Sequence, residues 1–189
     1  MTTQPQQGDA LLIVDAQKDF LPGGCLAVPD GDQVIAPLND WISRFTSAGL
    51  PVFATRDWHP ADHCSFQPQG GPWPPHCIAG TDGAAFADGL KLPADATIVS
   101  KATRKDADAY SGFAGTELQQ LLQESGVRRL FVGGLATDYC VLNSVRDALR
   151  LEYGVQLLTA AIRAVNVQPG DGARAVAEMI AAGAVALEN

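Results

Sequence analysis

The segment ESGVRRLFVGG, residues 124–134, shows how this chain is built. A helical apolar pattern ends before Gly126, and a short apolar run follows that is typical of a buried strand. The same design recurs in SAGLPVFATRD (47–57), EYGVQLLTAA (152–161) and AAGAVALE (181–188). Gly126, Gly154 and Gly183 lie 28 and 29 residues apart, close to the roughly 30 residues of one βαβ unit. The repeat predicts a parallel α/β sheet.

Apolar residues at helical spacing indicate four helices between the predicted strands. These stripes cover residues 34–45, 118–122, 141–149 and 176–180. Two more apolar runs, 10–14 and 97–99, bring the expected sheet to about six strands, all short and apolar as a sheet covered on both faces requires. We therefore expect a single domain over residues 1–189 with a three-layer α/β/α fold and a mostly parallel sheet, and a flexible start over residues 1–8.

The composition excludes several classes of partner. The 189 residues carry 13 Lys and Arg against 21 Asp and Glu, a net charge of −8, with no run of basic residues. Nucleic acid and an anionic membrane surface are therefore not expected partners. No apolar stretch near the start has the length of a signal peptide core or a membrane span. The four cysteines form no CxxC pair, so we expect reduced thiols in a cytoplasmic protein, a monomer or a small homo-oligomer.

One long stretch, residues 59–93, has no sustained helical or strand period, and half of the chain's 12 prolines fall in it. It also contains all three histidines of the chain: His59, His63 and His76. Long irregular loops in compact domains are usually functional or disordered. Together with Asp57, the histidines offer four oxygen or nitrogen ligands within 20 residues, which favours a functional metal site. A structural zinc site that adds Cys64 and Cys77 is a weaker alternative, because adjacent ligand pairs do not match the usual spacing.

Three reactive side chains follow the ends of predicted strands, where ligands bind in open α/β sheets. Asp15 ends the first strand, Lys101 ends the strand TIVSK, and Cys140 follows the turn GGLATD. We expect Thr137 or Asp138 to cap the helix that begins there, and the helix dipole to lower the pKa of the Cys140 thiol. A nucleophile, a proton acceptor and a cation are what covalent catalysis requires. Each residue taken singly has an ordinary structural explanation, so the hypothesis depends on their meeting in space.

Five motifs, in this order along the chain, resemble those of one family. They are VDAQKDF (14–20), RDWHPADHCSF (56–66), WPPHC (73–77), Lys101 with AYSGF (109–113), and GLATDYCV (134–141). In combination they are similar to the motifs of the nicotinamidases, also called pyrazinamidases, of the isochorismatase-like cysteine hydrolase superfamily. The resemblance implies the α/β/α fold of that superfamily. It also implies a small-molecule amide substrate: hydrolysis of nicotinamide to nicotinate and ammonia, and of pyrazinamide to pyrazinoate.

The resemblance further implies a role for each matching residue. Asp15 would be the general base, Lys101 the triad lysine and Cys140 the nucleophile. One divalent ion, zinc, iron or manganese, would be held by Asp57, His59 and His76, with His63 a ligand only in some members. Phe20, Trp73 and Tyr110 match aromatic pocket positions, and the backbone amides of Ala136 and Cys140 match the oxyanion hole. The family also commonly has a cis peptide before the position of Ala136.

One residue departs from the family pattern: glycine often follows the triad lysine, whereas Ala102 follows Lys101 here. This departure concerns the shape of the loop and the substrate range. Isochorismate-cleaving members lack the cysteine, so Cys140 argues against that reaction. Three alternatives stay open: an amidase for another small amide, such as a carbamoylated amine, a ureido compound or maleamate; a hydrolase whose metal activates water; and a binding module without turnover.

Overall fold

The computed structural model describes residues 4–188, and a single sheet of six parallel strands forms its centre. The strands are β1 (Asp9–Val14), β2 (Val52–Asp57), β3 (Thr97–Lys101), β4 (Arg129–Leu135), β5 (Gly154–Arg163) and β6 (Val185–Leu187). Their order in the sheet is β3-β2-β1-β4-β5-β6. The predicted strands and their parallel arrangement are confirmed. The expected flexible start, residues 1–8, falls partly outside the described residues and stays a prediction.

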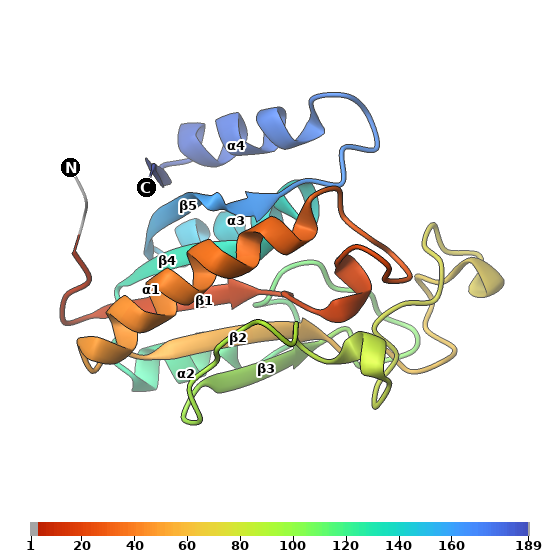
Figure 1. The fold of residues 1–189 in the computed structure, drawn as a ribbon, viewed down its shortest axis with the longest axis horizontal. Helices are drawn as coiled ribbons and strands as arrows, with labels where there is room; N and C mark the ends of the chain where they lie inside the picture. The colour runs from red at the N-terminus through yellow and green to blue at the C-terminus, as the bar shows by residue number, and fades with distance from the viewer. Residues whose placement is uncertain (1–3, 189) are drawn as a thin grey trace.

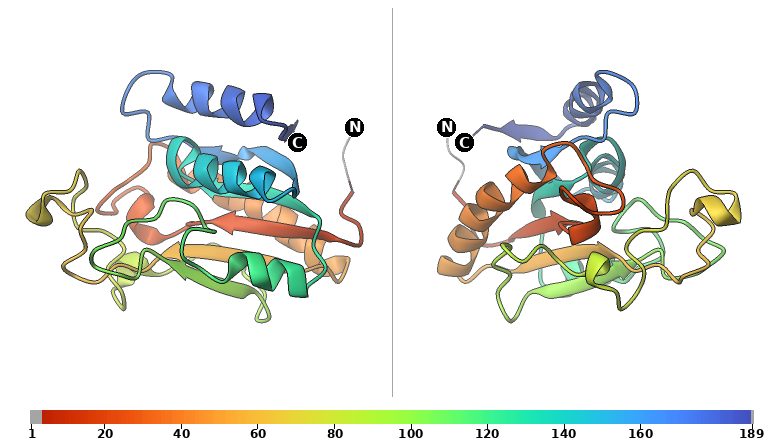
Figure 2. Two further views of the ribbon diagram at one scale, coloured as in Figure 1. Left: turned by 180° about the vertical axis from the view of Figure 1, so that it is seen from behind. Right: turned by 45° about the vertical axis from the view of Figure 1, so that its right-hand side comes forward.

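Helices cover both faces of the sheet, which confirms the three-layer α/β/α fold (Figures 1 and 2). The helix α1 (Ile35–Ser47) packs on one face, where its buried residues join one apolar core. The helices on the other face are α2 (Leu118–Glu124), α3 (Leu142–Arg150) and α4 (Asp171–Ala181), and they contribute to a second core. All four predicted helices are present. Within residues 4–188, no helix has the length and apolar character needed to cross a membrane.

The central strand β1 shows why the sequence folds this way. Successive side chains of a strand point to opposite faces, and all six residues of β1 are buried. Leu11 and Ile13 pack into the core under α1, whereas Leu12 and Val14 pack into the core under α2 and α3. A continuous apolar run is therefore required of β1, because neither face meets water.

The strand order reverses between β1 and β4, and this reversal positions the site. From β1 the chain builds β2 and β3 on one side and then crosses to β4 on the other. Residues 59–93 contain only short 3₁₀ turns, η3 (Gln67–Gln69) and η4 (Asp82–Ala84), as their lack of a period predicts. In Figure 1 the first part of this stretch, coloured yellow, extends beyond the carboxyl ends of β1 and β2, where ligands bind in doubly wound sheets.

Candidate active site

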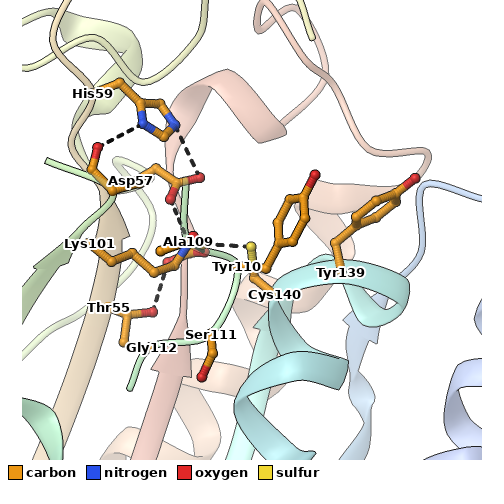
Figure 3. Close-up of polar contacts among 12 residues, drawn as sticks. Thr55, Asp57, His59, Lys101, Ala109, Tyr110, Ser111, Gly112, Tyr139 and Cys140 are labelled. Carbon is orange, nitrogen blue, oxygen red and sulfur yellow. Dashed lines mark hydrogen bonds and ion pairs between the residues drawn. The ribbon is translucent and has the colours of Figure 1, made fainter. Parts of the chain in front are cut away.

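The structure brings Asp15, Lys101 and Cys140 together from three elements. Asp15 follows β1, Lys101 ends β3, and Cys140 lies in a π-helical turn, η5 (Thr137–Val141), that continues into α3. The Lys101 ammonium lies 3.0 Å from Asp15 Oδ2. It also lies 3.4 Å from Cys140 Sγ (Figure 3). All three side chains are buried. The predicted meeting of these residues in space is confirmed.

Asp57 is a fourth member of this cluster, and sequence analysis placed it only with the metal ligands. Lys101 Nζ donates to Asp57 Oδ1 at 2.5 Å and to the carbonyl of Ala109 at 3.1 Å. The parallel register pairs Asp57 directly with Lys101. The Thr55 hydroxyl donates to Asp15 Oδ1 at 2.7 Å. One buried ammonium is therefore shared between two carboxylates and a sulfur.

The charges around Lys101 determine where the protons lie. Burial lowers the pKa of Lys101, but Asp15 and Asp57 outweigh it and hold that pKa well above its usual range. Burial raises the pKa of Asp57, but the Lys101 ammonium holds it below its ordinary value, so the carboxylate stays ionised. Burial raises the pKa of Asp15 more than Lys101 lowers it. A carboxylate with a raised pKa is a stronger base.

The expected lowering of the thiol pKa is wrong for the resting protein. Burial raises the pKa of Cys140 well above its usual range, and the Lys101 ammonium offsets only part of this rise. The physical reason is that desolvation of an anion outweighs the field of one helix terminus. The thiol is thus protonated at rest, and its proton must be removed during attack.

Asp57, His59 and His76 form a group suited to a metal ion. Their ligand atoms lie within 4.8 Å of one another, and all three side chains are buried. His59 Nδ1 lies 3.1 Å from the carbonyl of Ala102, and His76 Nδ1 lies 2.8 Å from the carbonyl of Pro74. A carbonyl only accepts hydrogen bonds, so each Nδ1 carries the proton and each Nε2 presents a lone pair.

The surroundings of His59 Nε2 support this interpretation. This atom is buried, has no hydrogen-bond partner among residues 4–188, and lies 3.6 Å from Asp57 Oδ2. A divalent cation held between these two facing acceptors would satisfy both of them. The Asp and His donor set suits zinc, iron or manganese.

His63 lies beside this group and not within it. Its ring stacks on the His59 ring with centroids 4.2 Å apart. Its Nδ1 lies 2.7 Å from the Ser65 hydroxyl, and its Nε2 lies 3.2 Å from the carbonyl of Ala107. Both nitrogens are engaged, so a ligand role for His63 stays a prediction that requires these bonds to break. Among the described residues, the converging ligand groups include neither Cys64 nor Cys77, and nothing supports the structural zinc site.

A pocket lined largely by apolar and aromatic side chains reaches Cys140. Phe20, Trp73 and Tyr110 line it, as the resemblance implies. Tyr139 also lines it and was missed, although it directly precedes Cys140. The Trp73 indole N–H donates to the Tyr110 hydroxyl at 3.1 Å, and the Tyr139 ring lies 5.1 Å from that of Trp73 and 5.4 Å from that of Tyr110. Figure 3 shows the two tyrosines side by side near Cys140.

The turn that precedes Cys140 differs from the expected helix cap. The Leu135–Ala136 peptide is cis, as the resemblance implies. The helix begins without a side-chain cap, so the expectation for Thr137 and Asp138 is wrong. The Asp138 carboxylate instead accepts hydrogen bonds from the amides of Val165 and Asn166. It ties the Cys140 turn to the loop after β5, whose Val165 lines the pocket.

Gln17 is a further residue that sequence analysis did not identify. Its amide nitrogen donates to the carbonyls of Asp57 and Ala84 at 2.8 and 2.9 Å, and its oxygen accepts from the Asp57 amide at 2.8 Å. Gln17 is fully buried. It therefore fixes the backbone of Asp57 from both sides. Only its place within VDAQKDF, two residues after Asp15, could have signalled this role.

Comparisons with known proteins agree with this geometry. A family model described as the isochorismatase domain matches residues 9–188. The chain is 41% identical to the nicotinamidase of Escherichia coli (strain K12), over 93% of this chain and 92% of that protein. The pyrazinamidase of Pyrococcus horikoshii in complex with zinc matches with a TM-score of 0.92 and 46% identity, over 96% of this chain and 99% of that chain. PnC1 from L. infantum in complex with nicotinate matches with a TM-score of 0.88 and 38% identity, over 96% and 93% of the two chains. The chain belongs to the isochorismatase family.

Proposed function

We propose that this protein hydrolyses nicotinamide to nicotinate and ammonia, and pyrazinamide to pyrazinoate, through a thioester on Cys140. The observation that carries the proposal is the Lys101 ammonium, which lies between the Asp15 carboxylate and the Cys140 sulfur beneath an aromatic pocket. The similarity to a nicotinamidase and to a nicotinate-bound structure supports the choice of substrate.

In the first half of the reaction, Asp15 accepts the thiol proton as Cys140 Sγ attacks the carboxamide carbon. Lys101 stabilises the developing thiolate. The amide oxygen becomes an oxyanion, which the backbone N–H groups of Ala136 and Cys140 stabilise by about 3–4 kcal/mol. Asp15 then returns the proton to the amide nitrogen, the C–N bond breaks, and ammonia leaves the thioester behind.

In the second half, a water molecule hydrolyses the thioester. Asp15 accepts a proton from the water as its oxygen attacks the carbonyl carbon. The C–S bond then breaks, the sulfur recovers a proton, and nicotinate is released. One water is consumed over the cycle, and the resting thiol is restored.

Asp57, His59 and His76 would hold the divalent ion. When bound, it would supply a Lewis acid that fixes the ring nitrogen of the substrate, directly or through a bound water. Asp57 would then serve both the ion and Lys101, which it already contacts. We take the ion to be zinc, iron or manganese. We place the reaction in the cytoplasm, because every cysteine of the described chain is a free thiol. We assign it to salvage of NAD, because the proposed substrate is nicotinamide.

The test is ammonia release from nicotinamide by the metal-loaded protein and by Cys140→Ala. We expect release by the wild type and a loss of at least about 1,000-fold in the variant, as for other catalytic nucleophiles. The same assay with a carbamoylated amine, a ureido compound and maleamate identifies the substrate class. Turnover of one of these without turnover of nicotinamide would overturn the substrate assignment, and binding without any turnover would overturn the enzyme assignment.

A further inference from the structure

Asp19 is a buried carboxylate that the proposed reaction does not use. It lies in η1 (Lys18–Phe20), four residues after Asp15, and is only 7% exposed. In the described part of the chain, no ion pair involves it. A buried carboxylate without a cation is expensive and is retained only where its hydrogen bonds matter.

Three separate segments meet at this carboxylate. Asp19 Oδ1 accepts from the Cys25 amide at 3.2 Å, and Asp19 Oδ2 accepts from the Cys77 amide at 2.7 Å. Gly83 packs so closely that a Cβ there would lie 2.3 Å from Asp19 Oδ2. The carboxylate therefore joins the segment after β1 to the loop that carries His76.

The Cys77 peptide groups connect Asp19 to both histidines of the metal group. The Cys77 amide belongs to the peptide bond that follows His76, and the Cys77 carbonyl accepts from the His59 amide at 3.0 Å. Cys77 has φ of +45°, an unfavourable conformation for a residue with a Cβ. A charged acceptor aimed at its N–H compensates for that conformation.

We propose that Asp19 is a positioning residue for the metal group: by holding the Cys77 peptide, it fixes His76 and His59 relative to each other. The proposal rests on the proposed metal site. Phe20, the next residue, packs against the His76 ring with centroids 5.7 Å apart, so the same short turn supports the ligand from a second side. Residues that orient metal ligands typically change metal affinity by about 10–100-fold when replaced.

The experiment titrates zinc alone into metal-free protein in competition with a chromogenic chelator. Two variants disturb the contact differently. Asp19→Asn keeps the shape and removes the charge, whereas Gly83→Ala keeps the charge and displaces the carboxylate from Cys77. Asp88→Asn is the matched control, because this aspartate has an 87% exposed side chain and pairs only with Lys18 among the described residues. Gly83→Ala carries the test if Asp19→Asn does not fold.

We expect zinc affinity to fall by about 10–100-fold in both test variants and to stay within about twofold of wild type in Asp88→Asn. At saturating zinc, kcat for nicotinamide should recover in both variants, because Asp19 contacts no reacting group. Wild-type zinc affinity in both variants would overturn the proposal. A loss of affinity confined to Asp19→Asn would also overturn it, because the charge of Asp19, and not its contact with the Cys77 peptide, would then determine zinc affinity. Failure of the wild type to bind zinc would instead overturn the metal site itself.

Discussion

At the scale of single residues, Lys101 is the side chain on which the site depends most. Its ammonium contacts both Asp15 and Asp57, and removal of one partner of a buried ion cluster leaves charge uncompensated. We expect Lys101→Met to lower the free energy of unfolding of the metal-free protein by about 3–5 kcal/mol. Urea unfolding measures this change.

Lys18→Met is the control for that prediction, because Lys18 also pairs with two aspartates, Asp82 and Asp88, at the surface. Water screens exposed pairs of this kind, so we expect little loss of stability in Lys18→Met. Equal losses of stability in the two variants would contradict the importance of the buried cluster.

The raised pKa of Asp15 predicts the acid side of the pH profile. Asp15 accepts a proton only when ionised, and burial raises its pKa, so kcat/KM should fall as pH decreases through a value above the ordinary aspartate pKa of about 4. The measurement is kcat/KM for nicotinamide across this range, with zinc content checked at each pH. A constant rate down to about pH 4 in metal-loaded protein would contradict the assignment of Asp15 as base.

At the scale of elements, Gly134 shows what the close approach of β1 and β4 requires. Gly134 has φ of +125°, and a Cβ there would lie 2.0 Å from the carbonyl oxygen of Val14. Backbone atoms cannot move aside cheaply, so Gly134→Ala should lower the free energy of unfolding by more than about 3 kcal/mol. Thermal and urea unfolding test this.

Gly126→Ala separates the steric effect from backbone preference. Gly126 also has a positive φ, +66°, but nothing lies within 4 Å of its would-be Cβ. Only the conformational preference is lost there, about 1–2 kcal/mol. Similar losses at both glycines would show that the strand contact at Gly134 is not tight.

The helices and strands themselves were predictable, because a helical apolar pattern that ends at a glycine, with a short apolar run after it, is a local signal. The start of the Cys140 helix was not, because the partners of Asp138 are amides 27 and 28 residues further along the chain. A capping rule considers only neighbours in sequence. Ala102 has φ of +50°, in the left-handed region that favours glycine, which gives a physical reason for glycine at the position after Lys101.

At the scale of the whole molecule, the reversal of strand order gathers the site from distant segments. The strand-end rule predicted that Asp15, Lys101 and Cys140 meet, since parallel strands end at one edge. Gln17 and Asp19 escaped prediction because they act through backbone groups 40 and 58 residues away. The protonated resting state of the Cys140 thiol was not predicted, because the burial that raises its pKa is a property of the folded molecule.

The arrangement of the pocket predicts what metal removal does. If the ion positions the ring nitrogen, chelation should lower kcat/KM for nicotinamide by at least about tenfold, about 1.4 kcal/mol. It should change the rate for benzamide, which lacks that nitrogen, far less. Steady-state kinetics before and after chelation, with zinc added back, measure both. Equal loss for the two amides would favour a metal that activates water.

The central claim is that a nicotinoyl thioester forms on Cys140, and trapping with hydroxylamine tests it most directly. Hydroxylamine intercepts an acyl-enzyme and gives nicotinohydroxamate, which mass spectrometry quantifies beside nicotinate and ammonia. We predict that metal-loaded wild type forms hydroxamate from nicotinamide in proportion to hydroxylamine, and that Cys140→Ala forms neither hydroxamate nor nicotinate. Nicotinate production by Cys140→Ala at the wild-type rate, without hydroxamate from either protein, would contradict covalent catalysis by this cysteine.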